Sequence, residues 1–370
     1  MGILSISTTK AGATPLLDLV KIMDPLVNQL TIISSEYNCN NLKNDYENIE
    51  LYSFDPKQKR KLVSRALSFV STQIKLSYEL FKLNKNIDIW VFFILGDILV
   101  LPMFTSKLLK KKVILISAGS VYQTYKSFND KFSAPAGLLF KINCKLADKI
   151  ILYSPSLIKE LDLDNHRNKI EIAHRHLPNL NKFKIKKDME YRDNLIGYVG
   201  RLSAEKGILN LIKSFPPMLE TNPKLKLCII GDGPERGSIE KFIENKRITN
   251  HVELMGWVDH EDIPNYLNKF KLLVIPSFTE GLPNIMLEAM ACGTPVLATP
   301  VGSIRDIISD GVNGFIMENN SSESIKKNIL RALTHKDLMS MGKVSHLYVE
   351  KEFNYEDTLE RFREILYNAV

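Results

Sequence analysis

The stretch PSFTEGLPNIMLEAMACGTPVLAT, residues 276–299, carries the clearest structural pattern in the chain. It follows an apolar run, passes through a loop that contains Glu280 and Gly281, and continues as a helix. Pro283 suits the first position of that helix, because the amide hydrogen that proline lacks would be unpaired there. Glu288 stands about 5 residues into the helix, which at a rise of ~1.5 Å per residue is roughly 7–8 Å from its end.

The start of this helix is a candidate anion site. The first N–H groups of a helix have no partner within it, and the helix dipole favours negative charge there. An anion at the amides of Asn284 and Ile285 would leave a ribose beside Glu288 and a second sugar beside Glu280. A carboxylate accepts hydrogen bonds from two adjacent hydroxyls, so glutamate suits both places.

A second candidate anion site lies in IGYVGRLSAEKG, residues 196–207. Arg201 follows Gly200 at the end of an apolar run, and Lys206 precedes the start of the next helix. Two cations that converge on a helix start favour a diphosphate. A strand–helix turn closed by a salt bridge is the alternative interpretation.

A further apolar run ends in LCIIGDGPE, residues 227–235. Gly231 and Gly233 surround an aspartate and allow a tight turn with backbone donors facing a ligand. The third glycine of a dinucleotide-binding fingerprint is absent, which disfavours a dehydrogenase.

Apolar runs alternate with amphipathic segments along the chain, as in βαβ units around parallel sheets. Open sheets of this kind bind ligands at the carboxyl edges of their strands. The polar segment at residues 179–194 is expected to be a linker, and residues 56–83 are expected to form one long helix. We expect strands at residues 3–7, 30–34, 49–53, 89–94, 113–117, 149–153, 195–199, 226–230, 252–255, 272–276 and 295–299.

Four motifs together resemble the donor domain of retaining glycosyltransferases of family 4, which have the GT-B fold. They are GRLSAEKG, GDGPE, GWV, and two glutamates with seven residues between them that lead into EAMACGTPV. The likeness is dense over residues 195–315 and loose over residues 1–180. It implies an α/β protein with two Rossmann-like domains whose parallel sheets face each other across a cleft. The expected parts are an acceptor domain at 1–185, a donor domain at 186–350 and a C-terminal helix at 351–370 that crosses back to the first domain.

The resemblance also implies an activity. A hexosyltransferase of this kind moves a sugar from a UDP- or GDP-sugar to a glycan or lipid-linked saccharide, with retention of anomeric configuration and without a cofactor or an obligatory metal. It implies that Arg201 and Lys206 neutralise the diphosphate, that Glu280 contacts the donor sugar and that Glu288 binds the ribose. The expected catalytic residues are Glu280, Arg201 and Lys206. The expected donor-binding residues are Gly200, Arg201, Lys206, Gly231, Gly233, Trp257, Val258, Glu280, Gly281, Leu282, Pro283, Asn284, Ile285 and Glu288.

The acceptor side departs from the family pattern. A histidine–glycine pair commonly follows the strand expected at 113–117, and this chain has Ala118 in place of the histidine. The glycine-rich loop near the N-terminus is reduced to Ala-Gly-Ala at residues 11–13. The residues expected on the acceptor side are Gly12, Gly96, Asp97, Gly119 and Ser120.

The positive charge of the chain belongs to its first half. Residues 1–180 contain 24 Lys and Arg against 16 Asp and Glu, or +8, whereas residues 181–370 contain 25 against 26, or −1. A basic face suits an anionic membrane surface, to which each cation close to the lipid contributes about 1 kcal/mol; solvated surface lysines are the alternative. No nucleic-acid partner is expected. Two clusters dominate the excess: Lys57, Lys59, Arg60, Lys61 and Arg65, and Lys107, Lys110, Lys111 and Lys112.

The missing secretory signal and the isolated cysteines lead us to expect a protein of the cytoplasm, and the basic first half favours a peripheral position at the inner face of the cell membrane. The start MGILSIST lacks the basic and apolar regions of a secretory signal. The most apolar stretch, residues 89–104, is 16 residues long and contains Gly96, Asp97 and Pro102, whereas a membrane span needs about 20 apolar residues. A strand, a turn and a helix fit it better. The four widely spaced cysteines are expected to be buried, reduced thiols.

Two alternatives to transfer remain at this stage. A GT-B epimerase or phosphorylase would share the fold and the diphosphate site. A non-catalytic nucleotide-sugar binding module would account for the departure at Ala118.

Overall fold

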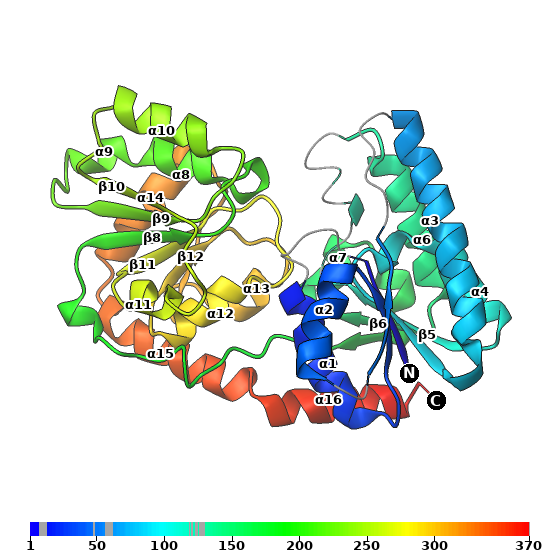
Figure 1. Cartoon of the computed structure of the whole chain (residues 1–370). Helices are drawn as coiled ribbons and strands as arrows, with labels where there is room; N and C mark the ends of the chain where they lie inside the picture. Colours follow the sequence, from blue (N-terminus) through cyan, green and yellow to red (C-terminus); the bar gives the residue numbers. More distant parts are fainter. Residues whose placement is uncertain are drawn as a thin grey trace. The chain divides into compact units, whose positions relative to one another are not determined.

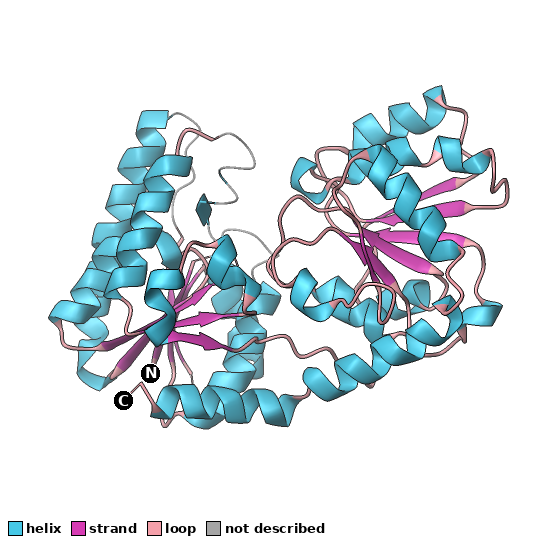
Figure 2. Cartoon of the chain, turned by 180° about the vertical axis from the view of Figure 1, so that it is seen from behind, coloured by secondary structure: helices cyan, strands magenta, loops and turns pink. Residues whose placement is uncertain are grey.

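The structure is a computed structural model of the chain, and it separates into two compact units (Figures 1 and 2). Unit 1 comprises Met1–His176 with Tyr355–Val370, and unit 2 comprises Leu177–Asn354. The boundaries expected from the sequence were 185/186 and 350/351. The described residues are 1–6, 13–46, 49–55, 62–117, 119, 121–122, 125 and 130–369.

Unit 1 is built on a parallel sheet with the strand order β3-β2-β1-β4-β5-β6-β7. Its central strands are buried on both faces, which explains their nearly continuous apolar sequences. Helices α1, α2 and α16 lie on one side of the sheet, and α3, α4 and α6 lie on the other (Figure 1). The strands are β1 (Gly2–Ser5), β2 (Thr31–Ser34), β3 (Glu50–Ser53), β4 (Ile89–Phe92), β5 (Lys112–Ser117), β6 (Lys149–Leu152) and β7 (Ile170–Ile172). The helices are α1 (Ala13–Met23), α2 (Glu36–Asp45), α3 (Leu62–Leu83), α4 (Val100–Leu108), α6 (Ser133–Leu146), α7 (Ser156–Glu160) and α16 (Tyr355–Tyr367).

Unit 2 repeats the plan with the strand order β10-β9-β8-β11-β12-β13, again all parallel. The order reverses between β8 and β11, the position at which open α/β sheets bind their ligands. The strands are β8 (Leu195–Val199), β9 (Lys226–Ile230), β10 (Val252–Gly256), β11 (Leu272–Ile275), β12 (Val296–Ala298) and β13 (Phe315–Ile316). The helices are α8 (Ile208–Ser214), α9 (Pro216–Leu219), α10 (Arg236–Asn245), α11 (Ile263–Leu267), α12 (Asn284–Ala291), α13 (Ile304–Ile307), α14 (Ser322–Leu333) and α15 (Leu338–Glu352).

These two parallel sheets, each covered by helices, confirm the expected α/β class. Strands β8 and β9 have the predicted bounds, and the other predicted strands begin and end within about two residues of theirs, the usual uncertainty of strand ends. Strands β7 and β13 were not predicted. They contain three and two residues, too few for an apolar run to stand out in a sequence.

The segment predicted to be a polar linker is instead packed onto unit 2. Phe183 and Met189 are buried, although the segment is rich in charged residues. Arg192 is buried as well, and its guanidinium donates to the carbonyl oxygens of Leu267 (3.3 Å) and Cys292 (2.8 Å). The linker prediction was therefore wrong, because its apolar anchors are single residues separated by lysines and follow no periodic pattern.

The C-terminal helix α16 packs within unit 1, where it contacts α1. Tyr355 Oη donates to the carbonyl oxygen of Lys21 (3.3 Å), and Arg361 Nε donates to that of Ile172 (3.1 Å). Phe362 is fully buried. These contacts tie the end of the chain to its first helix and to the edge strand β7.

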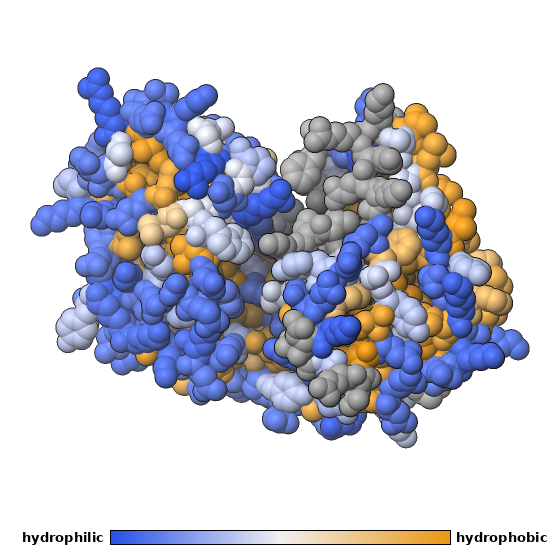
Figure 3. Space-filling model, in the orientation of Figure 1, coloured by the Kyte–Doolittle hydropathy of each residue, from blue (hydrophilic) through white to orange (hydrophobic). Residues whose placement is uncertain are grey.

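Residues 89–104 form strand β4, a short 3₁₀ helix (Gly96–Ile98) and the start of α4, as expected. None of the described helices has both the length and the apolar character needed to cross a bilayer. The expected long helix at 56–83 is described from Leu62 onward, as α3. Hydrophobic side chains form part of the surface around α3 and α4, with polar residues between them (Figures 1 and 3). Cys39, Cys144, Cys228 and Cys292 are free and buried.

Candidate functional site

The loops that follow β8 and β11 lie side by side at the reversal point of the unit 2 sheet. The two strands are hydrogen-bonded neighbours, so their carboxyl ends emerge together. The Phe278 amide donates to the carbonyl oxygen of Glu205 at 2.9 Å, which fastens one loop to the other. Residues that are far apart in sequence therefore share one edge of the sheet.

Lys206 and Glu280 meet across these loops. Lys206 Nζ lies 2.7 Å from Glu280 Oε1, and Ser277 Oγ donates to the same oxygen at 2.7 Å. The Glu280 side chain is 10% exposed and the Lys206 side chain 30%. Among the described residues, Glu280 Oε2 has no partner, so it is available to accept a hydrogen bond from a ligand hydroxyl.

Arg201 lies at the end of β8 with its side chain exposed to solvent. Its carbonyl oxygen accepts a hydrogen bond from Tyr198 Oη at 2.8 Å, which fixes the backbone from which the guanidinium extends. Burial raises the pKa of the Tyr198 phenol, and the charges of Glu280 and Glu205 raise it further. Tyr198 therefore stays protonated and remains a donor.

The loop after β9 approaches the loop after β8 so closely that side chains are excluded. Gly231 has a φ of +130°, and a Cβ there would lie 1.9 Å from the carbonyl oxygen of Gly200. A Cβ on Gly233 would lie 2.4 Å from the carbonyl oxygen of Leu202. Glycine at both positions therefore allows the two loops of the candidate site to pack closely. This packing explains the glycines without any contact to a ligand.

Helix α12 begins at Asn284, with Pro283 as its N-cap in an extended conformation. The prediction puts Pro283 at the first position of the helix, whereas the helix begins one residue later, at Asn284. Leu282 is buried, and the Ser303 amide donates to the carbonyl oxygen of Gly281 at 2.9 Å. The first amides of α12, which include that of Ile285, come at the end of this anchored loop.

Glu288 lies one turn further along α12 and is paired with a histidine that the sequence analysis missed. His260 Nε2 lies 2.8 Å from Glu288 Oε1, and the Glu288 side chain is only 11% exposed. The hydrogen bond to Glu288 raises the pKa of His260, with burial opposing it. His260 follows the GWV motif closely, where Trp257 is 84% exposed and Val258 half-buried. Nothing in the sequence indicates that this loop reaches α12.

In unit 1, the described acceptor-side residues lie around the end of β5. Asp97 is buried, and its Oδ2 accepts a hydrogen bond from the Val121 amide at 2.8 Å. Burial raises the pKa of Asp97 to about 6. The carbonyl oxygen of Gly119 accepts from Ser117 Oγ at 2.6 Å, and that of Gly96 accepts from Asn143 Nδ2 at 3.0 Å. The predicted residues Gly12 and Ser120, and the departure at Ala118, lie outside the described residues.

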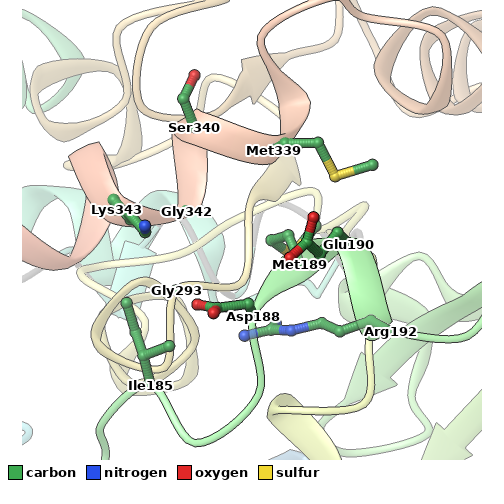
Figure 4. A pocket seen from close by; sticks show the side chains of 10 residues that line it. All are labelled: Ile185, Asp188, Met189, Glu190, Arg192, Gly293, Met339, Ser340, Gly342 and Lys343. Carbon is green, nitrogen blue, oxygen red and sulfur yellow. The ribbon is translucent and has the colours of Figure 1, made fainter.

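A hollow of about 290 Å³ in unit 2 contains none of the predicted site residues. It lies between the segment after Ile185 and helix α15, and Asp188, Arg192 and Lys343 are among the side chains that line it (Figure 4). Within the described part of the chain, no three His, Cys, Asp or Glu side chains come close enough together to hold a metal ion.

The chain is similar to known glycosyltransferases. Residues 181–343 match the family model of glycosyl transferases group 1. An uncharacterized glycosyltransferase of Methanocaldococcus jannaschii is 29% identical over 235 residues, 64% of this chain and 64% of the relative. The lipopolysaccharide 1,2-N-acetylglucosaminetransferase of Salmonella typhimurium is 29% identical over 180 residues, 46% of this chain and 47% of that enzyme. The chain thus spans less than two thirds of the length of either relative.

Solved structures agree on the architecture. Anabaena HepE, solved in complex with UDP and with UDP-glucose, superposes with a TM-score of 0.78 for the UDP complex and coverage of 100% of both chains, at 16% identity. The chain has the two-unit GT-B fold, as the sequence predicted.

Proposed function

We propose that the protein transfers a sugar from a nucleoside diphosphate-sugar to a saccharide acceptor. The observation that carries this proposal is the Lys206–Glu280 pair at the point where the unit 2 sheet reverses its strand order. It combines a cation for a diphosphate with a carboxylate that keeps one oxygen open for a sugar hydroxyl. The match to group 1 glycosyltransferases covers both residues.

Each side chain would have a distinct task in this reaction. Cleaving the bond between the anomeric carbon and the diphosphate places new negative charge on the leaving group. The ammonium of Lys206 and the exposed guanidinium of Arg201 would neutralise that charge, together with the first amides of α12. Glu280 Oε2 would orient the transferred sugar.

Glu288 would accept hydrogen bonds from the ribose hydroxyls of the nucleotide. Its partner His260 already holds one carboxylate oxygen at 2.8 Å and so fixes the orientation of the other. Trp257 is exposed and precedes His260 by three residues. Its ring would lie against the base. Gly231 and Gly233 would shape the wall of the site through the close approach of their loops.

The finer features are also proposals. They are a UDP- or GDP-linked hexose as donor, a glycan or lipid-linked saccharide as acceptor, retention of anomeric configuration as in family 4, and no required metal. HepE, which shares the fold, was solved with UDP-glucose, and this makes uridine the first base to test. Relatives that act on lipopolysaccharide motivate the acceptor class.

A thermal-shift panel of uridine, guanosine and adenosine diphosphate sugars tests the proposal. A ligand present at 100 times its dissociation constant stabilises the folded protein by about 2.7 kcal/mol, so the true donor should raise the melting temperature measurably. The transferase assignment further requires nucleotide release that depends on an acceptor. A free epimerised nucleotide-sugar, or a silent panel, would contradict it.

A further inference from the structure

Helix α3 leaves a stripe of large apolar side chains exposed to solvent. A helix on the surface of a globular protein normally buries its apolar stripe. Here the inward positions of α3 are taken by Gln73, Leu76 and Leu80, which are buried. The outward stripe runs over roughly 27 Å at ~1.5 Å per residue. Its members are between 54% and 71% exposed: Val63, Leu67, Val70, Ile74, Tyr78 and Phe81.

Helix α4, which packs against α3, exposes a second apolar stripe. Leu101, Phe104 and Leu108 recur at helical spacing and are exposed. The two helices pack against each other, and Gln73 Oε1 accepts a hydrogen bond from the Leu101 amide at 2.8 Å. We call the six α3 residues and these three α4 residues the α3–α4 surface. Hydrophobic surface in this region of unit 1 is visible in Figure 3. Large exposed apolar patches mark interaction sites, whereas singly scattered apolar residues are normal on a surface.

Within α3 and α4 the cations outnumber the carboxylates, with four Lys and Arg against one Glu. Glu79 is the one carboxylate within α3 and α4, and it is paired with Lys82 at 3.2 Å. Lys75 lies within α3, and Lys110, Lys111 and Lys112 follow α4 directly. Among the described residues, these three lysines have no ion-pair partner, so their charge is available to an anionic partner.

We propose that the α3–α4 surface docks onto an anionic lipid bilayer, with its apolar side chains in the interfacial region and the adjacent lysines among the headgroups. Helices with an apolar face beside Lys and Arg lie in such interfaces, and each cation near the surface adds attraction. We favour a bilayer over a second copy of the chain because anionic headgroups would neutralise the adjacent lysines, whereas the α3 and α4 helices of a second copy offer Glu79 as their one carboxylate. The inference does not rest on the transfer reaction, because it uses no residue of the candidate donor site.

Co-sedimentation with lipid vesicles tests the docking surface. The full chain is mixed with vesicles of phosphatidylcholine alone or with phosphatidylglycerol added, and the bound fraction is measured. The double variant Leu67→Gln with Ile74→Gln should lose roughly tenfold or more of its partitioning into anionic vesicles, since two large apolar side chains no longer leave water. The matched control, Val344→Gln with Leu347→Gln on exposed positions of α15, should bind like the wild type.

Charge provides a separate readout. Replacing Lys110, Lys111 and Lys112 by Gln should weaken binding to phosphatidylglycerol vesicles, and added salt should weaken binding of the wild type. If the α3 variant melts at a lower temperature than the wild type, a second apolar variant tests the same surface from α4. It is Leu101→Gln with Leu108→Gln.

Two outcomes would overturn the inference. One is equal sedimentation of the wild type and both apolar variants. The other is a wild type that does not bind vesicles but sediments as a dimer in analytical ultracentrifugation, while the Leu67→Gln and Ile74→Gln variant is a monomer. The α3–α4 surface would then mediate self-association.

Discussion

Lys206 Nζ and Glu280 Oε1 lie 2.7 Å apart although 74 positions separate the two residues in the chain. They meet because β8 and β11 are neighbours in the sheet and each is followed by a loop at the same edge. The pair is only partly screened from water, since 30% of the lysine side chain is exposed. Its main consequence is therefore expected in ligand binding and catalysis rather than in stability.

Lys206→Ala should lower turnover by roughly 100-fold or more, the usual cost of removing one group that stabilises developing charge. The variant should fold, because the lysine is partly exposed and Ser277 still donates to the carboxylate. Acceptor-dependent nucleotide release measures the effect. Lys213→Ala, at an exposed position of α8, is the control and should leave turnover unchanged.

Ser277 is a positioning residue, since it contacts Glu280 rather than any proposed substrate atom. Ser277→Ala should lower kcat by roughly 10-fold, in line with the loss of one hydrogen bond to a charged group. Its effect on the KM for the donor should be smaller, and Ser277→Thr should restore part of the rate. A change confined to thermal stability, with kcat intact, would remove this role.

Stability should depend on pH through His260. The pKa of this histidine is raised above its ordinary value of 6.5 when the protein folds, chiefly by the hydrogen bond to Glu288. A raised folded-state pKa means that the contribution is fully present below pH 6.5 and is lost as the pH rises through the folded-state value. Denaturant unfolding of wild type and His260→Ala across this range should therefore show a difference that shrinks with rising pH. A constant difference would contradict the protonated pair.

Gly231→Ala should destabilise unit 2 by at least ~1 kcal/mol, since alanine is strained at positive φ and its Cβ would meet the Gly200 carbonyl oxygen. Gly237→Ala is the matched control. A Cβ at Gly237 meets nothing within 4 Å, and the position lies in the first turn of α10, where alanine should stabilise by roughly 0.4–1 kcal/mol because it restricts the unfolded chain. Thermal melting should thus move in opposite directions for the two variants.

The sequence predicted most of the fold because parallel strands buried on both faces leave uninterrupted apolar runs. The bounds of β8 and β9 could be read from such runs, whereas β7 and β13 are too short to leave one. The same reasoning failed for Arg192, whose burial depends on carbonyl oxygens brought in from distant loops.

Site prediction had a similar limit. Glu280 and Glu288 lie in one loop and the helix that follows it, so their spacing could be predicted from the sequence. The partners Ser277 and His260 depend on side-chain direction and on the path of the loop after β10, which no periodic pattern records. The exposure of the apolar stripe on α3 was not predicted either. Periodicity identifies an apolar face of a helix but does not show whether another element covers it.

Isothermal titration of the nucleoside diphosphates UDP and GDP into the wild type and into Lys206→Ala tests the central claim most directly. We predict that one of the two binds the wild type and that the variant binds it roughly 10-fold to 100-fold more weakly, the loss of one charge-assisted contact to phosphate. Equal affinity of wild type and variant, or no binding of either nucleotide to the wild type, would contradict a diphosphate site at Lys206 and Glu280.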